Sequence, residues 1–194
     1  MAKQQIRRTF CLLALLVASV AAWSQDAIHI PVTHGTTLSG TQVTLPDALQ
    51  AKLNIVVIGF SHASQEQIGS WGRLIAADYG KSTDINYFEL AMLARAPRLM
   101  RGMIVKSMGS SVPFDERAHF IPVMEPDQPW RTVAHYDKSD DAYILLVDSK
   151  GTVLWQTEGE PSNAAYGAFK NQVTKTLRAE SQAEPVAPRS NSPH

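Results

Sequence analysis

Short apolar runs along the chain predict β-strands. We expect strands at residues 53–60, 85–90, 119–124, 143–147 and 152–155, after a more irregular extended segment at 28–45. The first run is nearly all apolar and β-branched, which is typical of a central strand covered on both faces. Pro122 marks the third as an edge strand, since proline cannot donate a ladder hydrogen bond. Gly151 ends the turn between the last two runs, so they predict a hairpin.

Between these runs the apolar spacing changes to a helical period. We expect helices at 64–79, from Pro97 to Gly109, at 129–136 and from Ser162 onward. Ser64 and Gln67 have the spacing of a capping box, which predicts that the Ser64 side chain caps the first helix. Gly80 is placed to end that helix.

The second predicted helix carries a methionine-rich stripe on one side. Its members are Leu99, Met100, Met103, Ile104 and Met108. Regularly spaced apolar residues usually face a core, so we expect this stripe to be buried. The alternative is that the stripe is an exposed binding surface for a partner, because flexible methionine side chains adapt to varied partners.

The order of these elements, β-α-β-α-(extra)-β-β-α, is that of the thioredoxin fold. We therefore predict an α/β, thioredoxin-like fold. Its central mixed sheet would contain parallel strands followed by a C-terminal antiparallel hairpin, with helices on both faces.

The N-terminus has the layout of a secretory signal peptide. Lys3, Arg7 and Arg8 precede an apolar run from Phe10 to Ala22, and a small-x-small pattern follows, ending at Ser24. We expect residues 1–24 to be a signal peptide and the protein to be exported, to a periplasm or outside the cell. The alternative is that the segment is retained as an anchor.

Removal of this signal changes both cysteine content and charge. Cys11 is the only cysteine of the chain, so the processed protein would have none. The signal holds three of 18 basic residues and none of 18 acidic ones, which leaves 15 minus 18, or −3. No basic stripe stands out, so we expect no nucleic-acid partner. We expect a thioredoxin-like domain at 25–178 and a disordered tail at 179–194, which is rich in Pro, Ser, Ala and Gln.

Several motifs resemble a known family. The Gly40-x-x-Val43-x-Leu45-Pro46 opening is similar to that of exported thioredoxin-like and peroxiredoxin-like domains. Val57–Trp71, Ala142–Asp148 and Gly151-x-x-x-Trp155 resemble the mitochondrial ATP-synthase assembly-factor family often called the "Atp-ten" type. The resemblance implies a thioredoxin-like fold without the redox motif and a role in assembling a membrane subunit of the synthase. Leu154 departs from the family, in which an arginine usually precedes the hairpin tryptophan.

The junction between the first strand and the first helix is where thioredoxins hold two cysteines. Here it holds Ser61, His62, Ala63, Ser64 and Gln65. A redox thioredoxin needs a thiolate at the helix N-terminus and a second thiol to resolve the mixed disulfide, and a hydroxyl supplies neither. The opposing cis-proline would fall near Ala142, where we expect a trans peptide bond. The sequence therefore predicts a redox-inactive protein with no cofactor.

The same junction is the candidate binding site. We expect a groove lined by Ser61, His62, Ser64, Gln65, Asp141 and Ala142, in which free N–H groups at the helix N-terminus accept a carboxylate or the surroundings of a backbone carbonyl. The predicted function is that of a protein-binding assembly factor or chaperone. Its partner would be another protein, such as a membrane-complex subunit, with membrane contact only through that partner or an uncleaved signal. A cysteine-free enzyme or a metal carrier that uses His62 is the alternative.

Overall fold

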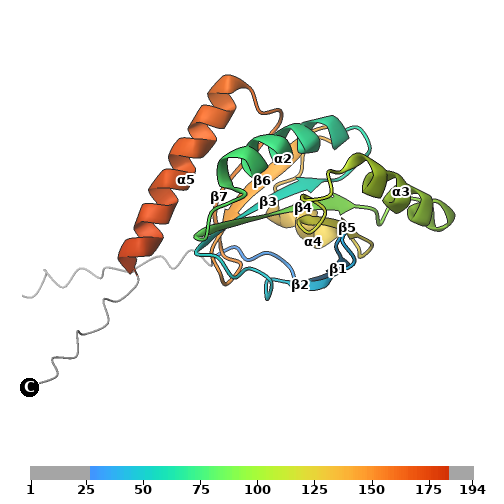
Figure 1. Cartoon of the computed structure of the whole chain (residues 1–194), viewed down its shortest axis with the longest axis horizontal. Coiled ribbons are helices and arrows are strands. Elements are labelled where there is room, and N and C mark those ends of the chain that lie inside the picture. Colours follow the sequence, from blue (N-terminus) through green and yellow to red (C-terminus); the bar gives the residue numbers. More distant parts are fainter. Residues whose placement is uncertain (1–26, 184–194) are drawn as a thin grey trace, which may run out of the picture.

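The fold is built on a five-stranded mixed sheet with helices on both faces (Figure 1). A computed structural model describes residues 27–183. The sheet order is β5-β4-β3-β6-β7. Its strands are β3 (Leu53–Gly59), β4 (Ile85–Met92), β5 (Phe120–Val123), β6 (Ala142–Val147) and β7 (Val153–Glu158). A separate hairpin is formed by β1 (Thr33–Thr36) and β2 (Gln42–Leu45).

The strand directions confirm the predicted fold class. β3 runs parallel to β4, and β4 runs parallel to β5. β6 is antiparallel to both β3 and β7, and β6 and β7 form the C-terminal hairpin. In the register, Val57 lies between Glu89 of β4 and Ile144 of β6. β3 is therefore the central strand, as its continuous apolar sequence predicts.

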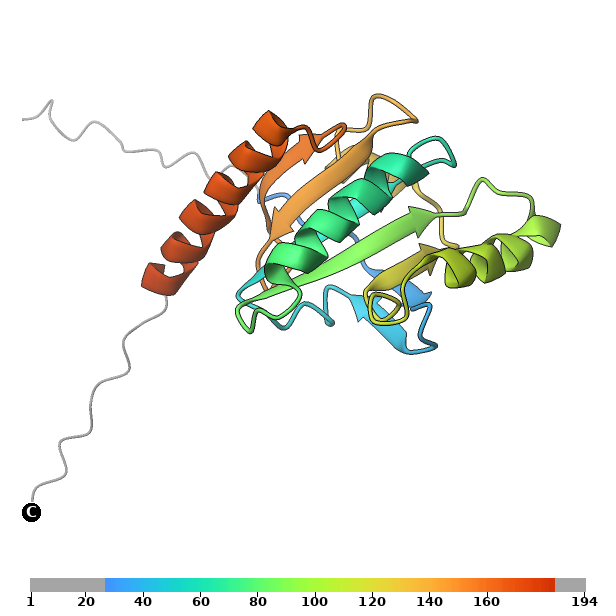
Figure 2. The ribbon, with the colours of Figure 1, turned by 45° about the horizontal axis from the view of Figure 1, so that its top comes forward.

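Four helices complete the described fold, and they divide between the faces of the sheet. They are α2 (Gln65–Tyr79), α3 (Arg98–Ser111), α4 (Gln128–Val133) and α5 (Asn163–Ala183). Figure 2 shows α2 and α5 on the near face of the sheet, with α3 at the opposite end of the molecule from α5. The Ser162 hydroxyl caps α5 by accepting a hydrogen bond from the Ala165 N–H at 3.2 Å.

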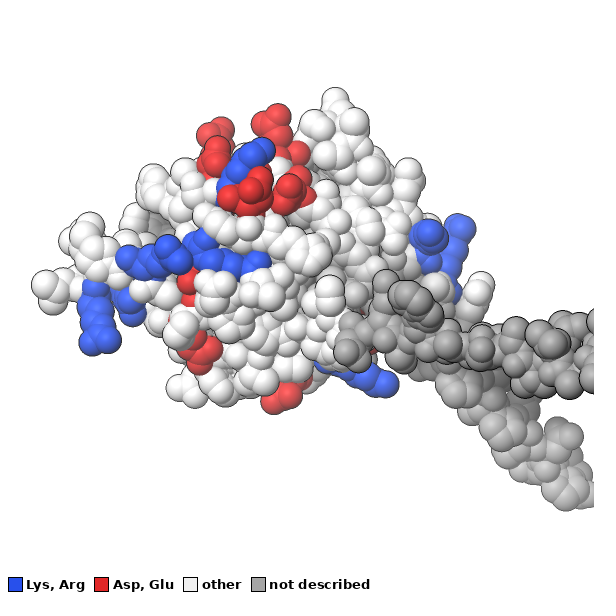
Figure 3. All heavy atoms as spheres, turned by 180° about the vertical axis from the view of Figure 1, so that it is seen from behind, with Lys and Arg blue, Asp and Glu red and all other residues white. Residues whose placement is uncertain are grey.

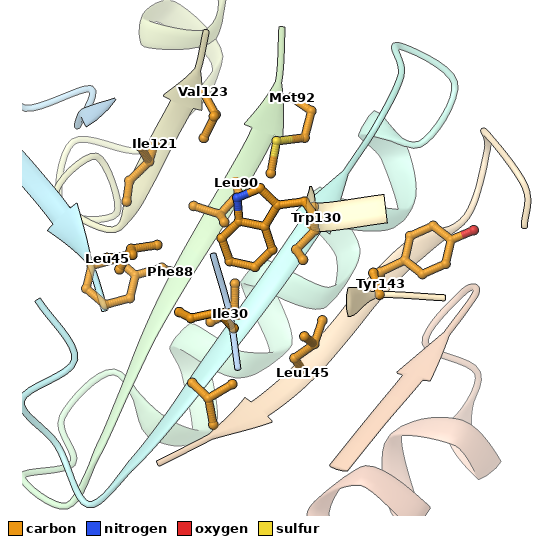
Figure 4. Close-up of a cluster of buried hydrophobic side chains, with 14 of the residues drawn as sticks. Ile30, Leu45, Phe88, Leu90, Met92, Ile121, Val123, Trp130, Tyr143 and Leu145 are labelled. Carbon is orange, nitrogen blue, oxygen red and sulfur yellow. The ribbon is translucent and has the colours of Figure 1, made fainter. Parts of the chain in front are cut away.

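Each face of the sheet has its own apolar core. Alternate residues of β3 supply the two sides, because successive side chains of a strand point to opposite faces. On one side Ile55 and Val57 pack with Trp71 of α2 and Phe169 of α5. On the other side Trp130 of α4 lies at the centre of a cluster from β3, β4, β5 and β6 (Figure 4).

Helix α3 departs from the prediction that its apolar stripe is buried. No residue of α3 is buried, and Leu99, Met100 and Met103 are exposed, whereas Ile104 and Met108 are half-buried. The prediction was wrong because no other layer of the described fold covers the outer side of this helix. Figures 1 and 2 both show α3 projecting at one end of the molecule, where it has no neighbouring layer on its outer side.

The bounds of the predicted domain, 25 and 178, differ from those of the described region, 27 and 183. Helix α5 continues to Ala183, five residues past the expected domain end at 178. The expected signal peptide at 1–24 and the rest of the expected tail, 184–194, lie outside the described residues. Within residues 27–183 no helix has both the length and the hydropathy that crossing a bilayer requires.

Candidate functional site

The junction between β3 and α2 is tightly built because α2 starts directly over the end of β3. A Cβ at Gly59 would lie 1.8 Å from Cδ1 of Ile68 and 2.8 Å from the Ser64 hydroxyl oxygen. Glycine therefore permits the close approach of the first turn of α2 to the strand. Phe60 follows and packs edge-on against Tyr136 and Tyr143, with centroid distances of 5.0 and 5.4 Å.

Ser61 holds the junction to the opposing loop. Its hydroxyl donates a hydrogen bond to the Ser139 carbonyl at 2.6 Å and accepts one from the Ala63 N–H at 3.0 Å. The hydroxyl hydrogen thus points to a carbonyl rather than to the imidazole of His62. Ser61 is a structural residue of the site in this geometry, not half of a nucleophile–base pair.

Ser64 does not cap the helix in the way the sequence predicts. It occupies the N-cap position, but its side chain makes no capping hydrogen bond. Its hydroxyl is buried and donates to the Ser61 carbonyl at 3.0 Å. The prediction was wrong because burial over Gly59 turns the hydroxyl back toward the loop.

The Gln67 side chain has a role that the capping-box pattern did not reveal. Its Oε1 accepts a hydrogen bond from the Ala142 N–H at 3.0 Å, so it joins α2 to the start of β6. Ala142 is fully buried, and the peptide bond that precedes it is trans, as expected. A contact between residues 75 positions apart leaves no local signal in the sequence.

The remaining predicted site residues lie at the surface of the same region. His62 and Gln65 are exposed, and Asp141 is half-buried at the end of the loop that Ser61 holds. The loop is fixed from behind by Tyr143, whose hydroxyl accepts hydrogen bonds from the N–H groups of Asp137 and Lys138, both at 2.9 Å. The structure therefore brings the predicted site residues to one junction: His62 and Gln65 are exposed, Ser61 and Asp141 are half-buried, and Ser64 and Ala142 are buried.

The hollow beside this junction differs from the predicted groove. It has a volume of about 290 Å³ and is lined by Ala63, Glu66, Gln67, Ser70, Asp140 and Glu160. Three carboxylates line it and no basic side chain does. This lining disfavours a carboxylate at the N-terminus of α2, because like charges repel, and it favours cationic or N–H donor groups instead.

A second, larger hollow lies at the β5 edge of the sheet. Its volume is about 700 Å³, and its walls come from the β1–β2 hairpin, Val105 of α3, and Pro122 and Met124 at the end of β5. His34 lies in its wall with Nδ1 3.1 Å from the Thr44 hydroxyl oxygen. No local pattern predicts this hollow, since its walls come from three separate segments.

Beneath α2, Glu89 of β4 is a buried carboxyl group, with only 4% of its surface exposed. A Cβ at Gly72 would lie 2.3 Å from its Oε1, so the glycine allows α2 to pass directly over the carboxyl group. Burial raises the pKa of Glu89 to about 8, the Glu116 carboxylate adds to the increase, and Arg73 opposes it. The structure therefore keeps this group protonated near neutral pH.

Metal ligands do not gather in this part of the chain. Among residues 27–183, no group of three or more His, Cys, Asp or Glu side chains is arranged to hold a metal ion. His62 therefore has no cluster of ligands around it in the described structure.

The fold and the junction together define a thioredoxin-like protein with serines where the redox cysteines of that class would lie. Solved structures support this class. BsSco, a member of the Sco family of cytochrome c oxidase assembly proteins, matches with a TM-score of 0.56 at 10% identity, over 82% of this chain and 96% of its own. A protein described as the thiol:disulfide interchange protein DsbE from Chlorobium tepidum matches with a TM-score of 0.53 at 18% identity, over 78% and 96%. The thioredoxin domain of a thiol-disulfide oxidoreductase from Bacteroides vulgatus gives 0.51 at 13%, over 76% and 96%.

The family is shown by the sequence itself. The profile of the ATP10 protein family matches residues 15–177, which is most of the chain, so this protein belongs to that family. The match confirms the resemblance seen in the strand, junction and hairpin motifs. Among curated proteins, no sequence matches the chain.

Proposed function

We propose that this protein is an exported, redox-inactive member of the ATP10 family that binds another protein as an assembly factor or chaperone. The observation that carries the proposal is the junction: a thioredoxin-like strand and helix meet through hydrogen-bonded serines, in a chain that belongs to the ATP10 family. The proposed partner is a subunit of a membrane complex, as the resemblance to synthase assembly factors implies.

The local chemistry supports binding rather than electron transfer. Ser61 and Ser64 are engaged in internal hydrogen bonds that hold the loop against α2. His62 and Gln65 are exposed on this junction. Because the loop is already held in place, binding a partner there loses little conformational entropy. The junction also holds the acidic hollow, with Glu66, Asp140 and Glu160 in its wall, in a fixed shape.

This arrangement indicates what the partner segment presents. The hollow is lined by three carboxylates and by no basic residue, which complements lysine, arginine or free N–H groups. We propose that an exposed segment of the partner places such groups in the hollow, beside His62. The proposal thereby replaces the carboxylate ligand that the sequence predicted.

Site-specific crosslinking in the native envelope tests this proposal. A photoreactive residue at Gln65, which is exposed at the junction, should capture one defined protein that is then identified by mass spectrometry. Placing the same residue at Asp47, exposed in the turn after β2, provides the matched control and should not capture it. Equal capture from both positions, or none from Gln65, would refute a binding site at the junction.

Substitutions at the hollow should weaken the capture without unfolding the protein. Glu66→Gln combined with Glu160→Gln should reduce affinity by roughly two- to thirtyfold, the range for losing two surface ion pairs. His62→Ala should also weaken capture and move the melting temperature little, because the side chain is exposed. Asp47→Asn serves as the charge control.

A metal that copurifies with the untagged wild type and is lost in His62→Ala would favour the metal-carrier alternative.

Redox silence is a separate prediction. The chain has no cysteine after Cys11, so a processed protein has no thiol for two-electron exchange. It should not reduce insulin disulfides, should not consume peroxide through a thiol, and should keep its melting temperature in dithiothreitol. Thiol-dependent turnover by a clean preparation would contradict the proposal.

Export makes a prediction about the N-terminus. The basic and apolar pattern of residues 1–24 motivates cleavage after Ser24, so mass analysis of the envelope form should find a protein that begins at or near Gln25. An envelope protein that begins at Met1 or Ala2 would show a retained segment instead. The family match starts at residue 15, inside the expected signal, so this measurement also decides how much of the matched region the working protein keeps.

A further inference from the structure

Helix α3 presents large apolar side chains directly to solvent. Leu99 is 98% exposed, Met103 67% and Met100 47%. Residues 99 and 103 are one turn apart, so they share a face of the helix. Met100 begins the adjacent row of the helix, whose next members, Ile104 and Met108, are half-buried. The outer apolar face therefore consists of Leu99, Met100 and Met103, and neither core of the domain uses it.

Every charged residue of α3 itself is basic. Residues 94–114 contain four basic residues, Arg95, Arg98, Arg101 and Lys106, and no acidic residue. Arg98 and Lys106 are exposed and form no ion pair with any residue in the part of the chain that the structure describes. Figure 3 shows basic groups beside uncharged side chains at the left, the end of the molecule where α3 lies in this view, whereas acidic groups gather at the top.

The start of α3 is held in place, so its orientation is defined. The Arg101 guanidinium donates to the carbonyls of Ala94 and Ala96, at 2.5 and 3.0 Å. Arg95 forms an ion pair with Asp127 at 3.2 Å, which joins the loop before α3 to the start of α4. The outer apolar face is thus a fixed, outward-facing feature of the domain.

We propose that α3 is an interfacial helix that docks the domain on an anionic lipid surface. The outer apolar face would enter the boundary between headgroups and acyl chains, while Arg98 and Lys106 contact anionic headgroups. Exposed apolar residues together with lysine and arginine, without acidic residues, are the composition of helices that lie in a membrane interface. This departs from the expectation that membrane contact comes only through a partner or an uncleaved signal.

The shape and charge favour lipid over a protein partner as the occupant. Helix α3 projects from the end of the molecule (Figures 1 and 2), so its outer side can lie along a flat, fluid surface. The basic segment is complementary to anionic lipid, although the processed chain as a whole carries −3. The inference is independent of the proposed function, because vesicles contain no partner protein.

A fluorescent label on α3 tests the proposal in the full-length protein. In a Cys11→Ser background, Met100→Cys provides a single attachment point for an environment-sensitive dye. Vesicles of equal phosphatidylglycerol and phosphatidylcholine should shift the emission to the blue, and lipids with acyl-chain quenchers should quench it. Vesicles of phosphatidylcholine alone should do so far less. The same dye at Ile28→Cys, 44% exposed beside the β6–β7 turn, should report neither effect.

Charge reversal supplies the second measurement. Arg98→Glu combined with Lys106→Glu should weaken partitioning onto the anionic vesicles by at least about 30-fold, from about one kcal/mol for each basic residue removed near such a surface. Lys81→Glu combined with Lys150→Glu makes the same change in net charge at exposed positions outside α3 and should have a much smaller effect. No blue shift on anionic vesicles, or equal losses from both charge pairs, would overturn the proposal. Labelled α3 that ignores vesicles but is protected by a bound protein would assign the face to a protein partner instead.

Discussion

Replacing Glu89 with glutamine is expected to remove a large pH dependence of stability. The folded protein holds this carboxyl group with a pKa of about 8, raised from 4.5 by burial and the Glu116 carboxylate against the opposing effect of Arg73. Between these two values the unfolded chain has released the proton and the folded chain has kept it. The folded state then binds more protons than the unfolded state, so the free energy of unfolding falls as pH rises. The slope reaches about 1.4 kcal/mol per pH unit.

The wild-type protein should therefore be more stable at pH 5 than at pH 8 through this group, and Glu89→Gln should lack that part of the decline. Urea unfolding at both pH values measures the difference. Glu66→Gln, at an exposed position of α2, is the control and should change stability by a similar amount at both. If Glu89→Gln costs the same stability at pH 5 and pH 8, the carboxyl group is ionised in the folded protein and the interpretation of its burial is wrong.

Truncation of Trp71 to alanine is expected to give the largest loss of stability of any substitution near the junction. Trp71 is fully buried between α2, the sheet and α5, with ring centroids 5.3 Å from Phe169 and 5.8 Å from Tyr166. Its indole N–H donates to the Gly159 carbonyl at 2.8 Å. Removing such a side chain leaves a cavity and an unpaired carbonyl, and typically costs about 3–5 kcal/mol.

Two comparisons separate the parts of this effect. Trp71→Phe keeps most of the packing and loses the hydrogen bond, so it should cost less than the alanine substitution. Trp155→Ala removes a half-buried tryptophan of β7 that lies 6.3 Å from Phe169, and it should also cost less. Equal losses for Trp71→Ala and Trp155→Ala in urea unfolding would contradict the central position assigned to Trp71.

The two proposed surfaces have opposite charge and different chemistry. The hollow beside the junction is lined by three carboxylates, whereas the segment around α3 has four basic residues and no acidic one. The net charge of the chain is near zero, but these two surfaces have electrostatic potentials of opposite sign. Such a separation lets one surface receive a cationic partner segment while the other contacts anionic lipid.

The sequence determined the order of strands and helices along the chain, the central position of β3 and the absence of a thiol from the junction. Residues 53–60 are nearly all apolar, so both faces of this strand must be buried. That requires a strand in the middle of a sheet that is covered on both sides. The hairpin could be predicted because a glycine, Gly151, ends its turn. The structure gives this residue a φ of 81°, a backbone conformation that favours glycine. These features depend on neighbouring residues, and local patterns report them directly.

Tertiary structure decided how individual side chains are used. Ser64 and Gln67 have the spacing of a capping box, yet one hydroxyl turns back to Ser61 and one amide reaches Ala142, because β3 and β6 approach α2 there. The stripe on α3 has the period of a buried face, but periodicity does not say whether a second layer exists to cover it. Glu89 looked like an ordinary strand residue, and only the approach of Gly72 overhead encloses its carboxyl group. Each of these outcomes depends on contacts between segments far apart in the chain, which a local pattern does not contain.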